Sequence, residues 1–309
     1  MKMMRFILPL LVFFVAVSGR VGAQEVLPYD QVMNVVYAEA DGVGLIMDVF
    51  KPTGKGLLPE YKPNENGKGL GIIDIVSGAW SSDRGKIEDH KKAHMYHIFC
   101  ARGYTVFGIR PGSDDKFTGT EMLRNINKGI RYVKQHAAEY GVDPERLGMT
   151  GASAGGHLAC LTAVKAEDGD ANAKDPQARL STRVKAVAVF FPPTDFLNWG
   201  GKEVNFEKLG RLFINCGIEG HSHDEVVAAA KDVSPINFVK PGLPPFILFH
   251  GDADPLVPLQ QSESMVAALK GAGIEAELIV KPGGGHPWMT ISEEVVLMAD
   301  WFDKHLAKR

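Results

Sequence analysis

The sequence predicts an α/β protein with one doubly wound, mostly parallel sheet that carries helices on both faces. Short apolar segments alternate with amphipathic segments of helical length along most of the chain. One segment, residues 70–76, is apolar except for Asp74, as expected of a strand that is covered on both faces. In addition, several glycine-flanked polar side chains directly follow the predicted strands, at the sheet edge where ligands bind in such folds.

The composition is that of an ordinary globular protein. The chain has 309 residues, of which 45% are hydrophobic and 23% charged, enough for one large α/β domain. Its net charge is −3, without a long run of either sign, so nucleic acid is not an expected partner. Three cysteines, Cys100, Cys160 and Cys216, are widely spaced, so at most one disulfide can form and buried thiols are favoured.

Residues 1–23 have the pattern of a secretory signal peptide. Lys2 and Arg5 precede an apolar run from Phe6 to Val17, and compact residues precede an expected cleavage after Ala23. A membrane span needs about 20 apolar residues, so a retained anchor is the less favoured alternative. We expect the mature domain, residues 24–309, to be secreted or periplasmic, without a stable membrane anchor.

The first predicted elements form an antiparallel hairpin at the sheet edge. Residues 31–38 and 45–50 read as strands on either side of an Asp41-Gly42 turn. A surface loop rich in Gly, Pro, Lys and Asn follows at 53–68, before the central strand. The next predicted elements are a helix over 86–101, a strand over 104–109, and a helix over 121–140 that ends at Gly141.

The second half continues the alternation, with one interruption. Residues 195–230 break the pattern with short apolar pieces, and we interpret them as a small lid or cap insertion. Trp199, Phe206 and Phe213 in this insertion can line a substrate cleft or pack the lid itself. The regular elements predicted around it are strands at 147–150, 184–191, 246–249 and 275–280, and helices at 156–163, 260–272 and 292–306.

The pentapeptide Gly151-Ala152-Ser153-Ala154-Gly155 has the form of a nucleophile elbow. In such a turn a serine stands between a strand and a helix, and its strained backbone leaves no room for bulky neighbours. The N-terminus of the helix that follows also points free N–H groups at a developing negative charge. We predict that Ser153 is a catalytic nucleophile; the alternative is a turn of small residues without chemistry.

A serine nucleophile needs a base, and the base needs an acid residue that orients it. In doubly wound hydrolases the acid and then the histidine follow the serine along the chain. Here Asp254 follows the strand at 246–249, and His286 follows the strand at 275–280 after three glycines. We predict these two residues as the acid and the base. Asp252 is the alternative acid, although bracing of its loop is its expected role.

The tetrahedral intermediate of such a reaction needs two or three N–H donors around its oxyanion. Ala154, directly after the nucleophile, should supply one, and Gly78 and Ala79 in the turn after the central strand should supply the others. Trp80 in this turn and Trp288 next to His286 are predicted to bind the substrate.

Taken together, these motifs resemble the α/β-hydrolase serine esterases, near the secreted carbohydrate esterases (acetyl-xylan and feruloyl esterases) and the hormone-sensitive-lipase-like carboxylesterases. The resemblance runs from about Asp48 to the C-terminus. It is carried by Asp143-Pro144-Glu145-Arg146, Gly151 to Leu158, Pro193-Thr194-Asp195-Phe196, Ser234-Pro235-Ile236-Asn237, His250 to Asp254 with Val257-Pro258, and Gly285-His286.

Two segments depart from the family pattern. The family's oxyanion turn usually reads His-Gly-Gly-Gly-Trp or His-Gly-Gly-Ala-Trp, whereas this chain has Val76 for the His and Ser77 for the first Gly. The histidine that usually braces the turn is therefore missing. The usual Tyr-Arg at the end of the next strand is also replaced, by Ile109-Arg110.

The resemblance implies the α/β-hydrolase fold and the hydrolysis of short acyl or aryl esters, including acetyl or feruloyl groups on polysaccharides, without a metal or organic cofactor. A peptidase of the prolyl-oligopeptidase type and a non-catalytic carbohydrate-binding relative are the alternatives. The oligomeric state is left open.

Two patterns resemble metal sites, but both are incomplete. His90, His94 and His97 share a helix face, but the glutamate that a zinc protease needs at position 91 is Lys91. The loop that begins at Asp168 lacks the glycine and the final glutamate of a calcium loop.

Overall fold

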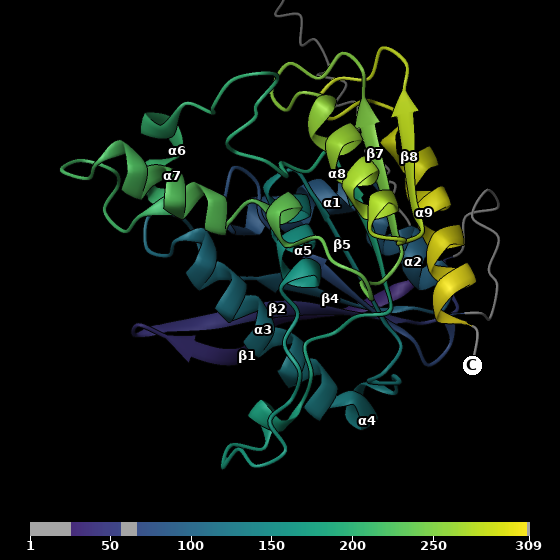
Figure 1. Ribbon diagram of the computed structural model, residues 1–309. Helices are drawn as coiled ribbons and strands as arrows, with labels where there is room; N and C mark the ends of the chain where they lie inside the picture. Colours follow the sequence, from purple (N-terminus) through teal and green to yellow (C-terminus); the bar gives the residue numbers. More distant parts are fainter. Residues whose placement is uncertain (1–25, 57–66, 308–309) are drawn as a thin grey trace, which may run out of the picture.

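The computed structural model describes residues 26–56 and 67–307 (Figure 1). The predicted signal peptide, residues 1–23, lies outside the described residues, as does most of the predicted loop at 53–68. Within the described ranges, no helix has the length and apolar character needed to cross a membrane.

In the described part of the chain, eight strands form one sheet in the order β1-β2-β4-β3-β5-β6-β7-β8. The β1–β2 and β2–β4 pairs are antiparallel and all other pairs are parallel, which confirms the predicted mostly parallel sheet with a hairpin at its edge. The strands are β1 (Tyr29–Ala40), β2 (Val43–Pro52), β3 (Gly71–Ile75), β4 (Thr105–Arg110), β5 (Leu147–Ala152), β6 (Ala186–Phe190), β7 (Phe246–Gly251) and β8 (Ala276–Lys281).

Helices cover both faces of this sheet (Figure 1). On one face α1, α2 and α9 pack together with alternate strand residues such as Ile72, and on the other α3, α5 and α8 pack with their neighbours, such as Ile73. The helices are α1 (Arg84–Lys92), α2 (Met95–Ala101), α3 (Gly119–Gln135), α4 (Ala137–Tyr140), α5 (Ala154–Val164), α6 (Phe206–Phe213), α7 (His223–Asp232), α8 (Gln260–Gly271) and α9 (Ile291–Leu306), with short 3-10 helices η2 (Gln177–Arg179) and η3 (Pro235–Phe238).

Two helices that were predicted as continuous are interrupted. The helix predicted over 86–101 is divided into α1 and α2, because His94 takes a left-handed conformation with φ 58°. Only two residues of α1 are buried, whereas every residue of α2 is buried, so the chain enters the core at this point. The helix predicted over 121–140 is divided at His136, although it ends at Gly141 as expected, with φ 68°.

The insertion at 195–230 connects β6 to β7 and contains α6 and most of α7 (Figure 1). Both helices lie to one side of the layered part of the molecule. Phe196 stacks on Trp199 at 6.1 Å and meets Phe213 edge-on at 5.3 Å, so aromatic residues of the insertion pack against one another. The prediction that it acts as a lid stays a prediction.

Candidate active site

Ser153 lies between β5 and α5 in a strained conformation, with φ 54° and ψ −120°. Its glycine neighbours are required by space. A Cβ on Gly151 would lie 2.5 Å from the carbonyl oxygen of Gly155, and a Cβ on Gly155 would overlap the carbonyl oxygen of Ile75. The strand, the turn and the helix therefore approach so closely that only glycine fits, which explains the small residues of the pentapeptide.

The loops after β7 and β8 bring Asp254 and His286 to this serine. The Nε2 atom of His286 lies 2.8 Å from Ser153 Oγ, and its Nδ1 atom lies 2.6 Å from Asp254 Oδ2. A carboxylate can only accept, so Nδ1 carries the proton and Nε2 accepts the hydroxyl proton of Ser153. The structure thus brings together the three side chains that were selected from the sequence.

The carboxylate of Asp254 is held in the charged form. Its side chain is fully buried, which opposes ionisation, but hydrogen bonds from His250, His286 and the backbone outweigh burial and keep its pKa well below the ordinary value. The backbone donors are the N–H groups of Leu256 and Val257, both bonded to Oδ1. A buried, ionised carboxylate on Nδ1 favours the imidazolium that forms when His286 takes a proton.

Asp252 has a different role from Asp254. Its side chain accepts the N–H of Gly283 at 2.6 Å, so it connects its own loop to the glycine-rich loop before His286. This agrees with the bracing role that was expected for it.

His250 and Phe191 also contact this group, and no role was predicted for either from the sequence. The Nε2 atom of His250 donates to the carbonyl of Val257 at 2.9 Å and lies 3.4 Å from Asp254 Oδ2. The ring of Phe191, whose φ is 33°, lies 4.2 Å from that of His286. The position of His250 at the end of a predicted strand, four residues before Asp254, was a usable signal; for Phe191 there was none.

The three N–H groups that were predicted as oxyanion donors differ in whether they are already hydrogen-bonded. The N–H groups of Ala154, at the start of α5, and of Ala79 have no hydrogen-bond partner among the described residues. Gly78 does not fit the prediction, because its N–H donates to the carbonyl of Ser81 at 2.9 Å. Gly78 and Ser81 close a tight turn in which Ala79 and Trp80 both have positive φ, 48° and 57°.

The two tryptophans predicted to bind substrate are buried. Trp80 is 7% exposed and its indole N–H donates to His157 at 3.0 Å. Trp288 is 9% exposed and its N–H donates to Glu294 at 2.8 Å. Their polar atoms are satisfied inside the protein and little of either ring is exposed, so the substrate-binding role predicted for the two tryptophans stays a prediction.

No metal centre is formed by the described residues: no three or more His, Cys, Asp or Glu side chains gather in a suitable arrangement there. His90, one of the three histidines considered above, instead bonds to the buried carboxylate of Asp74 at 2.7 Å. All three cysteines are free thiols, with Cys100 and Cys160 buried and Cys216 exposed.

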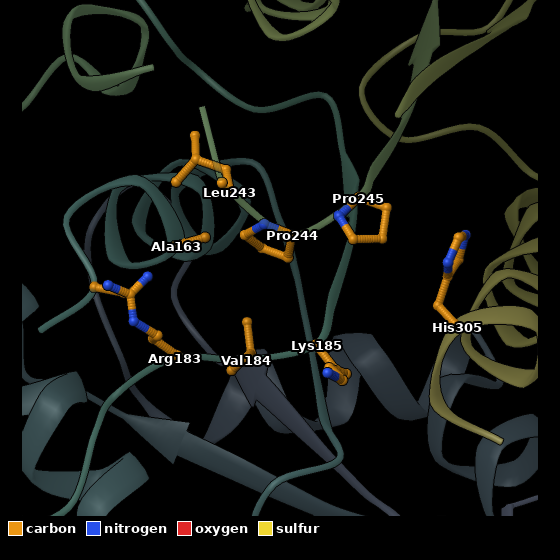
Figure 2. A pocket seen from close by; sticks show the side chains of 10 residues that line it. Ala163, Arg183, Val184, Lys185, Leu243, Pro244, Pro245 and His305 are labelled. Atoms are coloured by element: carbon orange, nitrogen blue, oxygen red, sulfur yellow. The ribbon is translucent and has the colours of Figure 1, made fainter. Parts of the chain in front are cut away.

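A cavity of about 390 Å³ lies before the first residues of β6 and β7 (Figure 2), whereas Ser153 follows the last residue of β5. It is bordered by Val184 and Lys185 before β6, by Pro244 and Pro245 before β7, and by His305 near the end of α9. The catalytic candidates follow the carboxyl ends of the strands, so this cavity is not their substrate pocket.

Comparison with known proteins relates the chain to esterases. The profile of the BD-FAE family matches residues 60–269 of the chain. The esterase LipQ of Mycobacterium tuberculosis is 28% identical over 205 residues, which are 65% of this chain and 46% of LipQ. The chain thus spans about half the length of this curated relative.

Two solved structures cover nearly the whole chain. A truncated carbohydrate esterase from gut microbiota has 26% identity and a TM-score of 0.73, covering 93% of this chain and 99% of its own. The thermophilic esterase Est2 of Thermogutta terrifontis has 26% identity and a TM-score of 0.62, covering 87% of this chain and 90% of its own. These named relatives are esterases, the enzyme class that the sequence resembles. Because the family profile matches more than half of its length, the chain belongs to the BD-FAE family, within the α/β-hydrolase esterases.

Proposed function

We propose that the chain hydrolyses short acyl or aryl esters through an acyl-enzyme, with Ser153, His286 and Asp254 as its catalytic triad. One observation carries the proposal. A continuous set of hydrogen bonds, 2.6 Å and 2.8 Å long, runs from a buried ionised carboxylate through an imidazole to a serine on a strained elbow.

The proposed reaction begins when Ser153 Oγ attacks the ester carbonyl and passes its proton to His286 Nε2. The negative charge on the resulting tetrahedral oxygen is met by the N–H groups of Ala154 and Ala79. Collapse of the intermediate breaks the bond to the alcohol, which leaves with the proton from His286. Water then attacks the acyl-serine and passes a proton to His286. The second tetrahedral intermediate breaks its bond to Ser153 Oγ, which takes that proton back, and the acid is released.

Esterified carbohydrate is the substrate class that we propose, with acetyl and feruloyl groups as the candidate acyl parts. Support comes from the carbohydrate esterase of gut microbiota, which aligns with almost the entire chain. We also propose that the protein is exported after cleavage behind Ala23, on the basis of the basic and apolar segments before it. Mass spectrometry of the protein recovered from the periplasm or medium should show Gln24 as the first residue.

The function is tested with p-nitrophenyl acetate and with acetylated and feruloylated oligosaccharides. Wild-type protein should hydrolyse the aryl ester, and Ser153→Ala should remove nearly all activity, because loss of a triad serine costs about 10⁶-fold in turnover. A variant that retains the wild-type rate would refute the assignment. Cleavage of aminoacyl anilides without ester cleavage would favour the peptidase alternative, and oligosaccharide binding without labelling by a fluorophosphonate would favour the non-catalytic one.

A further inference from the structure

The oxyanion turn of this chain lacks the histidine that usually braces it, and two of its residues have unfavourable backbone conformations. Ala79 and Trp80 both adopt positive φ in a tight turn, a conformation for which glycine, asparagine and aspartate are preferred. Residues with larger side chains keep such a conformation only where their surroundings hold them. The contacts of Trp80 therefore decide where the neighbouring N–H of Ala79 points.

A buried relay of hydrogen bonds holds Trp80. Its indole Nε1 donates to His157 Nδ1 at 3.0 Å, and the Nε2 of the same imidazole donates to the carbonyl of Val233 at 2.7 Å. The direction is fixed at both ends, since an indole N–H can only donate and a carbonyl can only accept. His157 therefore carries its proton on Nε2 and is neutral.

The surroundings keep His157 in that state. Its side chain is completely buried, and burial lowers its pKa to about 4. The rings of Trp80 and Phe196 contact the imidazole edge-on, at 5.7 Å and 5.1 Å. A protonated Nδ1 could no longer accept from Trp80, so the neutral ring is a requirement of the relay.

The relay connects three segments that are far apart in sequence. Trp80 belongs to the oxyanion turn, His157 to the first turn of α5 beside the nucleophile, and Val233 directly follows α7, just beyond the insertion. A second bond, from the N–H of Gly155 to the carbonyl of Ser77 at 2.9 Å, joins the same turn to the same helix.

We propose that the Trp80–His157–Val233 relay positions the oxyanion hole in place of the missing histidine, so that Trp80 and His157 are positioning residues for the ester hydrolysis proposed above. The inference rests on that proposed function. It predicts that breaking the relay weakens stabilisation of the tetrahedral intermediate and leaves binding of the ester in its ground state unchanged.

Trp80→Phe tests this most directly, because it keeps an aromatic ring and removes the donor. We expect kcat for p-nitrophenyl acetate, per active site titrated with a fluorophosphonate, to fall roughly 10- to 100-fold with little change in KM, less than the loss of a whole oxyanion donor. Affinity for an alkyl boronic acid should fall in parallel. Ser153 Oγ adds to the boron while its proton passes to His286, and the resulting anionic tetrahedral boronate places one of its hydroxyl oxygens in the oxyanion hole.

Two further variants separate positioning from packing. His157→Gln retains one acceptor and one donor and should preserve more of kcat and of boronate affinity than His157→Phe, which retains neither. Trp301→Phe is the matched control: Trp301 is buried in α9, its indole N–H has no partner among the described residues, and its loss should not change kcat.

The outcomes distinguish this inference from the function on which it rests. A wild-type protein that neither hydrolyses the ester nor reacts with the fluorophosphonate would refute the proposed function, and the inference with it. An active wild type whose kcat per titrated site and boronate affinity survive Trp80→Phe would refute the inference alone. The same holds if the variants lose only thermal stability or the fraction of titratable sites. If His157→Phe does not fold, the comparison of Trp80→Phe with Trp301→Phe decides.

Discussion

Replacement of Asp254 by asparagine should inactivate the enzyme almost without changing its shape. The reason lies in the three hydrogen bonds that the carboxylate accepts from Leu256, Val257 and His286. Oδ1 accepts the N–H groups of Leu256 and Val257 at 2.8 Å and 3.0 Å, so the amide oxygen of the asparagine side chain must take that position. The NH₂ group is then forced into the Oδ2 position, which faces His286 Nδ1.

This orientation reverses the tautomer of His286. Its Nδ1 would accept from the amide, so the proton would move to Nε2, and Nε2 would donate to Ser153 Oγ when it should accept. We expect kcat to fall about 10⁴-fold, which corresponds to about 5 kcal/mol of transition-state stabilisation. KM should change much less, because the substrate contacts remain.

The assay is the steady-state hydrolysis of p-nitrophenyl acetate by Asp254→Asn, with the melting temperature as a check on folding. Asp252→Asn is the matched control on the same loop: its amide oxygen can still accept the N–H of Gly283, and we expect kcat close to wild type. A folded Asp254→Asn enzyme with kcat within tenfold of wild type would refute the argument. An equal loss of kcat in Asp252→Asn would also refute it.

Three further predictions follow from other contacts. Gly155→Ala should destabilise the protein by about 3 kcal/mol or more and abolish hydrolysis, because its Cβ would overlap the backbone of Ile75, whereas Gly271→Ala, with open space around it, should raise the melting temperature slightly. The folded-state pKa of His157, about 4 against an ordinary 6.5, means that its neutral form is required, so stability is full above pH 6.5 and falls as the pH drops toward 4. In urea titrations between pH 6.5 and pH 4, the free energy of unfolding of wild type should fall by about 3 kcal/mol more than that of His157→Gln. An equal fall in both proteins would contradict this account. His250→Phe removes the imidazole whose Nε2 lies 3.4 Å from Asp254 Oδ2 and should lower kcat about tenfold, or about 1.4 kcal/mol; an unchanged kcat would show that the other contacts of the carboxylate suffice.

Much of the fold was predictable because it depends on local patterns. The alternation of short apolar and longer amphipathic segments located all eight strands of the described sheet to within a few residues. The helix interruptions at His94 and His136 were not predictable, and only the one at His94 marks a passage from a partly exposed helix into the core. Helical periodicity continues across both points.

The candidate active site was likewise predictable only in part. The order of Ser153, Asp254 and His286 along the chain, with small residues around the serine, was readable because each motif marks the end of a strand, and parallel strands end at one edge. The sequence by itself therefore determined which side chains meet. Only the tertiary structure decided that the N–H of Gly78 is already bonded, that Trp80 and Trp288 face inward, and that His157 accepts from Trp80. The physical reason is that a hydrogen bond or a buried surface depends on its partner as much as on the residue itself, and these partners come from segments whose proximity only the folded chain creates.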